Sequence, residues 1–142
     1  MKIAIASDHA GYELKNKLRS VLERKGYQVH DFGTDSPESC DYPDYAHPLA
    51  EAIEAAEYDL GIVMCGSGNG INMVVNKHQG IRSALCWEEE LAEMARKHNN
   101  ANVLSLPARY IDQDLALKLV EIFLTTDFEG GRHQRRIDKI PC

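Results

Sequence analysis

Short apolar runs alternate with amphipathic stretches along most of this chain. Residues 2–7 carry the apolar run Ile-Ala-Ile-Ala, and residues 59–65 carry another that ends in a cysteine. Between these runs, Leu14, Leu18 and Leu22 recur at the spacing of one helix face. A run that is apolar on both faces is typical of a strand buried in a parallel sheet, and an amphipathic stripe predicts a helix packed on that sheet. The alternation therefore predicts an α/β fold.

The full pattern predicts five strands with helices between them. Strands are expected at residues 2–7, 27–32, 59–65, 81–86 and 102–106, and helices at residues 11–25, 45–57, 71–77, 88–98 and 112–124. This order implies right-handed crossovers and a five-stranded parallel sheet with helices on both faces. A length of 142 residues with 44% hydrophobic content suits one ordinary core. We expect a single-domain, Rossmann-like three-layer sandwich over residues 1–142.

Two of the expected helices carry markers at their amino ends. Pro48 is expected near the first turn of the helix at residues 45–57, where its missing N–H costs little. Asp112 is expected to cap the last helix through its side-chain oxygen.

Charge and composition disfavour several classes of function. The formal net charge is −6 and the pI is near 5.5, whereas surfaces that bind nucleic acid or anionic membranes need an excess of Lys and Arg. No apolar run approaches the roughly 20 residues that span a bilayer, and the amino-terminal run is too short for a signal peptide. We therefore expect a cytoplasmic protein that binds neither nucleic acid nor a membrane.

The 4 cysteines and 6 histidines are scattered along the chain. No C-x-x-C pair and no H-E-x-x-H motif occurs, and a reducing cytoplasm keeps thiols free. We therefore expect free cysteines and no bound metal.

A glycine-rich segment, Gly66-Ser67-Gly68-Asn69-Gly70, follows the third expected strand directly after Cys65. Open parallel sheets bind ligands beyond the carboxyl ends of their strands, near the point where the strand order reverses. Asp8-His9 follows the first strand and Trp87-Glu88 follows the fourth. These segments are expected at the same edge of the sheet as the glycine loop.

The glycine loop offers backbone N–H groups that no side chain shields, so it would stabilise an anion or a developing oxyanion. The same positive field favours the thiolate of Cys65, which could then act as a base or a nucleophile. The alternative is a tight turn beside a small buried thiol. A cysteine phosphatase needs an arginine six positions after its cysteine, where this chain has Ile71, and a dinucleotide fold places its glycines after the first strand.

Three other groups of polar residues are candidates for ligand binding. Asp8 and His9 could orient a hydroxyl-rich ligand, or Asp8 could cap the helix that follows. Residues 98–100, His-Asn-Asn, are better explained by a helix C-cap, because asparagine tolerates a left-handed conformation. Arg132 and Arg136 are one helical turn apart and could bind a phosphate dianion, or could lie on a solvated helix face.

Taken together, these segments resemble the type B (RpiB) ribose 5-phosphate isomerases, in the family that also includes galactose 6-phosphate and allose 6-phosphate isomerases. The resemblance is collinear over nearly the whole chain. It rests on motifs at residues 7–11, 41–43, 65–71, 76–77, 80–82, 98–99, 102–104 and 129–133.

The resemblance implies a role for each site residue. Cys65 matches the base that removes the C2 proton of the open-chain sugar to give a cis-enediolate, and Ser67 is expected to help proton movement between the oxygens. His98 matches the general acid that opens the furanose ring, assisted by Asp8. The ligand-binding positions implied are Asp8, His9, Tyr42, Gly66, Ser67, Gly68, Asn69, Gly70, Asn99 and Arg109, with Arg132 and Arg136 as the phosphate clamp.

The resemblance also implies the reaction, which is the interconversion of ribose 5-phosphate and ribulose 5-phosphate in the pentose phosphate pathway, without metal or cofactor. The alternatives are an allose or galactose 6-phosphate isomerase, or a non-catalytic phosphosugar-binding protein. Galactose enzymes divide their catalytic residues between two different subunits, whereas this chain holds all motif positions. The family further implies a homodimer or tetramer with shared sites, in which residues 127–142 reach the site or the partner subunit.

Overall fold

A computed structural model describes residues 1–142 and contains five strands and seven helical segments. The strands are β1 (Lys2–Ser7), β2 (Gln28–Asp31), β3 (Leu60–Cys65), β4 (Ser83–Leu85) and β5 (Val103–Pro107). The helices are η1 (His9–Gly11, a 3-10 turn), α1 (Tyr12–Arg24), α2 (Pro43–Glu54), α3 (Asn69–Val75), α4 (Glu89–Asn99), α5 (Gln113–Thr125) and α6 (Arg132–Ile137). None of these helices combines the length and apolar character needed to cross a bilayer.

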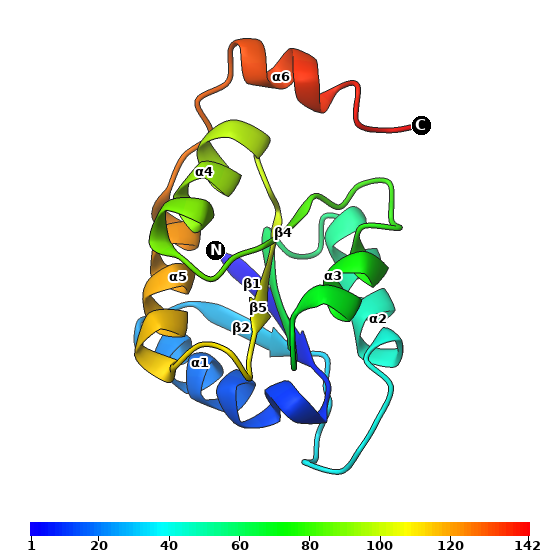
Figure 1. Ribbon diagram of the computed structural model, residues 1–142, viewed down its shortest axis with the longest axis vertical. Coiled ribbons are helices and arrows are strands. Elements are labelled where there is room, and N and C mark those ends of the chain that lie inside the picture. The colour runs from blue at the N-terminus through cyan, green and yellow to red at the C-terminus, as the bar shows by residue number, and fades with distance from the viewer.

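All strand pairs are parallel and the strand order is β2-β1-β3-β5-β4, which confirms the expected α/β sheet. Helices α1, α4 and α5 cover one face and α2 and α3 cover the other (Figure 1). The chain passes from β1 outward to β2 and then crosses back to place β3 on the other side of β1. The carboxyl ends of β1 and β3 therefore lie side by side at the reversal of strand order, where such sheets bind ligands.

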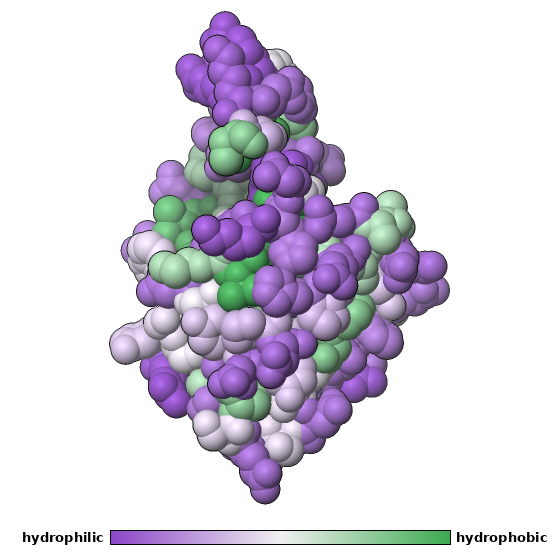
Figure 2. Space-filling view, turned by 90° about the vertical axis from the view of Figure 1, so that its right-hand side faces the viewer, coloured by the Kyte–Doolittle hydropathy of each residue, from purple (hydrophilic) through white to green (hydrophobic).

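The segment around α6 projects beyond the opposite end of the sheet, next to the end of α4 (Figure 1). It forms a narrow and strongly hydrophilic end of the molecule (Figure 2). Unlike the other helices, it covers neither face of the sheet (Figure 1).

The sheet separates two apolar cores. One contains 19 buried residues, including Ile62 and Met64 of β3, and packs beneath α1, α4 and α5. The other contains 12 buried residues, including Val63 and Cys65, and packs beneath α2 and α3. Successive side chains of a strand point to opposite faces, so β3 supplies both cores in turn. That is why its sequence is apolar throughout.

Some boundaries differ from those expected. Helix α2 begins at Pro43 rather than residue 45, so Pro48 lies inside the helix rather than near its first turn. Pro43 takes the first helical position, which favours proline because that N–H has no intrahelical partner. Helix α3 begins at Asn69, within the glycine loop, and β4 is only three residues long. Asp112 caps α5 as expected, accepting from the N–H of Leu115 at 2.7 Å.

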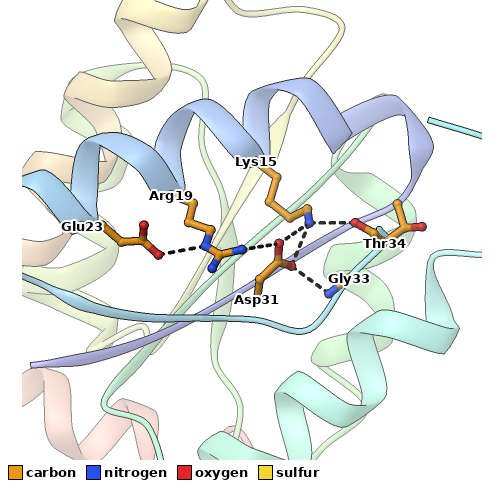
Figure 3. Close-up of polar contacts among 6 residues, drawn as sticks. All are labelled: Lys15, Arg19, Glu23, Asp31, Gly33 and Thr34. Carbon is orange, nitrogen blue, oxygen red and sulfur yellow. Dashed lines mark hydrogen bonds and ion pairs between the residues drawn. The ribbon is translucent and has the colours of Figure 1, made fainter. Parts of the chain in front are cut away.

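A buried lysine ties α1 to the carboxyl end of β2 (Figure 3). Lys15 is 0% exposed. Its Nζ donates to both oxygens of Asp31 at 2.7 and 2.6 Å and to the carbonyl of Thr34 at 2.7 Å. The carbonyl of Gly33 and the N–H of Thr34 in turn hydrogen-bond Ser7, the last residue of β1. The lysine thus fixes the corner that lies against the end of β1, where the candidate site begins.

Replacing Lys15 with methionine is expected to lower the free energy of unfolding by about 3 kcal/mol, because it leaves the Asp31 carboxylate in the interior without its main cation. Arg19, whose Nη1 is 3.5 Å from Asp31, keeps the loss at the lower end of the usual range. Urea unfolding measures the change. Lys17→Met, at an exposed position of the same helix, is the control and should stay within about 0.5 kcal/mol of the parent. Equal stability of the two variants would contradict the structural role of Lys15.

Candidate active site

The loop after β3 is tied to the segment that follows β5. Cys65 is the last residue of β3 and is 5% exposed. Its carbonyl accepts from the N–H of Ala108 at 3.0 Å, and the carbonyl of Gly66 accepts from the N–H of Arg109 at 3.0 Å. The Arg109 side chain lies over Gly66, since a Cβ there would be 3.1 Å from Nη1. A positive charge therefore stands beside the loop, as expected for a site that binds an anion.

Gly68 gives the loop its sharp turn. Its φ of 75° is left-handed, and a Cβ at this position would meet Leu85 Cδ1 at 2.5 Å. The hydroxyl of Ser105, on β5, donates to the Gly68 carbonyl at 2.8 Å. Only glycine fits such a position, so the loop keeps one shape in which its N–H groups are preorganised.

Tyr42 packs against the other end of the loop. A Cβ at Gly70 would lie 2.5 Å from the Tyr42 Cζ and 2.7 Å from its Oη, so the ring contacts the glycine backbone directly. Ser67 and Asn69 are exposed, and the Ser67 Oγ accepts from the N–H of Asn69 at 3.2 Å. The structure thus brings Tyr42, Arg109 and the whole loop together around Cys65.

Asp8 and His9 lie beside this loop. The N–H of Asp8 donates to the carbonyl of Met64 at 3.4 Å, one residue before Cys65. The Asp8 Oδ1 accepts from the N–H groups of Ala10 and Gly11 at 2.9 and 3.3 Å, so the expected capping role is confirmed. The caps engage only Oδ1, which leaves Oδ2 able to meet a ligand hydroxyl.

The position of one His9 proton follows from a backbone contact. The His9 Nδ1 accepts from the N–H of Cys40 at 3.2 Å. In the neutral ring, the proton is therefore on Nε2. His9 presents a fixed donor at the carboxyl end of the sheet.

The second group of predicted residues lies at the opposite end of the molecule. His98 and Asn99 end α4, and Asn100 caps that helix in the left-handed conformation (φ 45°, ψ 44°), as expected. A helix between parallel strands returns the chain to their amino ends, so His98 precedes the start of β5, whereas Cys65 pairs with its last residue, Pro107. One chain therefore does not place His98 next to Asp8 or Cys65.

The two predicted arginines belong to this second group. Arg132 and Arg136 are exposed on α6. Arg136 lines a hollow between α4 and α6 together with His98, Asn99, His133, Ile137 and Ile140. Arg132 does not line this hollow, although it lies one turn away on the same helix. The arginines are thus close to His98 and remote from the glycine loop.

Two residues that sequence reasoning missed accompany His98. The ring of His133 stacks on that of His98 with centroids 4.3 Å apart, and a Glu129 oxygen is 3.9 Å from His98 Nε2 and 3.5 Å from His133 Nε2. Burial lowers the pKa of His133, and the charges of His98 and Arg132 act in the same direction. The only sequence signal was their place in the motif at residues 129–133.

Comparison with known proteins gives one consistent result. The model of the Ribose/Galactose Isomerase family matches residues 3–140. The ribose 5-phosphate isomerase of Thermotoga maritima is 53% identical with a TM-score of 0.97, over 99% of this chain and 97% of that one. Ribose-5-phosphate isomerase B of Mycoplasma genitalium, solved with bound ribulose-5-phosphate, is 45% identical with a TM-score of 0.93, over 98% and 93%. Ribose-5-phosphate isomerase B of Escherichia coli is 42% identical, over 98% of this chain and 93% of its own length.

Proposed function

This chain belongs to the ribose/galactose isomerase family, and on that premise we propose that it interconverts ribose 5-phosphate and ribulose 5-phosphate. The observation that carries the proposal is full-length similarity to a relative that binds ribulose-5-phosphate. The Cys65 loop at the reversal of strand order supplies the chemistry that this reaction needs.

The isomerisation is a proton transfer between two carbons. The Cys65 thiolate removes the proton from C2 of the open-chain aldose, the C1–C2 double bond forms, and the carbonyl oxygen becomes an enediolate oxygen. The N–H groups of residues 66–70 stabilise this negative charge, with Arg109 beside them. Return of the proton to C1 gives the ketose, while Ser67 moves the hydroxyl proton between O1 and O2.

The other steps need the residues at the far end of the sheet. His98 is proposed to protonate the ring oxygen of the furanose, with the Asp8 carboxylate accepting the proton of the anomeric hydroxyl. Because these groups lie at opposite ends of one chain, a second copy must present its α4–α6 end to the Cys65 loop of the first. A two-fold dimer would then contain two equal sites. We propose this homodimer, with a tetramer as the further assembly.

The phosphate group is proposed to bind between the two copies. Arg132 and Arg136 of one copy would hold its oxygens, and His9 and Asn99 would contact the sugar. Backbone donors and guanidinium groups supply the positive charge that the reaction needs, so turnover is proposed to require neither metal nor cofactor. A charged sugar phosphate does not cross a bilayer freely, so the protein is proposed to act in the cytoplasm, as one folded domain.

A comparison of substrates tests the proposed function. The purified protein should isomerise ribose 5-phosphate in a coupled assay with a chelator present, and kcat/KM should exceed that for allose or galactose 6-phosphate by at least about tenfold, the usual discrimination for one extra carbon. A higher kcat/KM for a hexose phosphate would support the hexose alternative. Tight binding without turnover of any of the three would support a non-catalytic phosphosugar-binding protein.

A further inference from the structure

Three side chains able to bind a metal ion meet where α6 packs against α4. The ligand atoms of His98, Glu129 and His133 all lie within 4.8 Å of one another. Two imidazoles and one carboxylate are an established ligand set for Zn²⁺, with a fourth position left for water. The backbone N–H of Glu129 donates to the carbonyl of Lys97 at 3.1 Å, so the carboxylate is anchored beside the end of α4.

The His133 ring points independently to a missing ligand. Its side chain is 7% exposed, and Nε2 is buried without a hydrogen-bond partner, although the Glu129 carboxylate is only 3.5 Å away. Buried polar atoms in proteins nearly always have a partner. Burial also lowers the pKa of this ring, which leaves the neutral imidazole that binds metals.

A small rotation completes the geometry. The His98 and His133 rings are stacked with an angle of 12° between them, so their nitrogen lone pairs run nearly parallel rather than converging. The His98 side chain is 38% exposed and can turn about its Cβ–Cγ bond. Nitrogen and oxygen ligands lie about 2.0–2.2 Å from Zn²⁺, and an ion between the three atoms would draw them together from their present 3.5 and 3.9 Å contacts with Glu129.

We propose that His98, Glu129 and His133 form a site for a divalent transition-metal ion such as Zn²⁺, and that the bound ion inhibits the isomerase. The binding part stands on the geometry alone. The inhibition rests on the proposed function, in which the same nitrogen of His98 carries the proton that opens the sugar ring. A nitrogen that coordinates a metal cannot hold that proton.

Metal binding is measured first. Zn²⁺ is titrated into the purified, metal-free protein in competition with a chromophoric chelator of micromolar affinity, and one ion per chain is expected. Glu129→Gln, at a 49% exposed carboxylate, and His133→Asn should each lose that ion. His47→Asn is the matched control, because His47 and His78 form the other histidine pair and their nitrogens face each other across a 2.8 Å hydrogen bond. Absence of binding, or binding that both site variants retain, would overturn the metal site.

Activity is measured next, with the same zinc additions. Stoichiometric Zn²⁺ should inhibit the parent protein at least tenfold and leave Glu129→Gln, which retains Cys65 and His98, within twofold of its metal-free rate. Equal inhibition of both proteins would place the inhibitory ion elsewhere, for example on the Cys65 thiol, and would overturn the inference. Loss of binding in the variants without any inhibition of the parent would leave the metal site intact but contradict the role of His98 in the proposed function.

Discussion

Replacing Cys65 with alanine is expected to lower kcat by at least about 10³-fold, because the proton on C2 then has no base within reach. The affinity for ribulose 5-phosphate should stay within a few-fold, since the backbone N–H groups of the loop remain in place. Fluorescence or calorimetric titration measures binding, and the coupled assay measures kcat. Near-normal turnover would contradict the assignment of Cys65 as the base.

A second cysteine provides the control for this variant. Cys86 is 0% exposed, and burial raises its pKa to about 12. Its thiol therefore stays protonated at neutral pH and cannot serve as a base. Cys86→Ala should lose some stability through the cavity it creates but should keep kcat within a few-fold of the parent.

Replacing His98 with asparagine is expected to lower kcat/KM for ribose 5-phosphate by at least about 10²-fold, through loss of the acid that opens the furanose ring. Ribulose 5-phosphate cannot form a furanose, because the hydroxyl that would close the ring carries the phosphate. Exchange of its C1 proton with D₂O therefore needs the base but no ring opening. By NMR, His98→Asn should retain this exchange within about tenfold, whereas Cys65→Ala should abolish it.

The control for this variant is Lys97→Met, at the neighbouring position of the same helical turn. Lys97 pairs with Glu93 on its own helix, so its loss should leave kcat/KM within a few-fold. Loss of C1 exchange in His98→Asn would contradict the ring-opening role, because it would mean that His98 acts in the enediolate step itself.

The fold followed from the sequence because both faces of the sheet are buried. The run at residues 2–7 is apolar throughout and matches β1 at both ends. Local chemistry was also predictable where a side chain acts on its own backbone. Asp8 and Asp112 cap helices as expected, since a cap depends on residues only two or three positions away.

Contacts between distant segments were not predictable. Lys15 stands next to Leu14 in an amphipathic helix, where a lysine normally reaches solvent, and its partner Asp31 is 16 positions away. The cluster of Glu129 and His133 with His98 depends on how α6 docks against α4, and no periodicity encodes that docking.

The division of the candidate site between two ends of the molecule is a consequence of topology. Each crossover helix carries the chain back to the amino ends of the strands, so a residue at the end of α4 lies far from residues that follow β1 and β3. The motifs of the family are collinear in sequence without being adjacent in one chain. Assembly from two copies reconciles these observations, and it is the central claim to test.

Mixing two inactive variants tests that claim most directly. Cys65→Ala and His98→Asn are inactivated at opposite ends of the chain, so a hybrid dimer would contain one site with both defects and one site with neither. Equal amounts allowed to exchange subunits should recover about one quarter of the parent activity, because half of a random mixture is hybrid. A mixture of His98→Asn with Arg136→Ala, both altered at the same end, should recover nothing. If subunit exchange is verified by mass spectrometry and the first mixture is no more active than the sum of its parts, the site does not combine two copies.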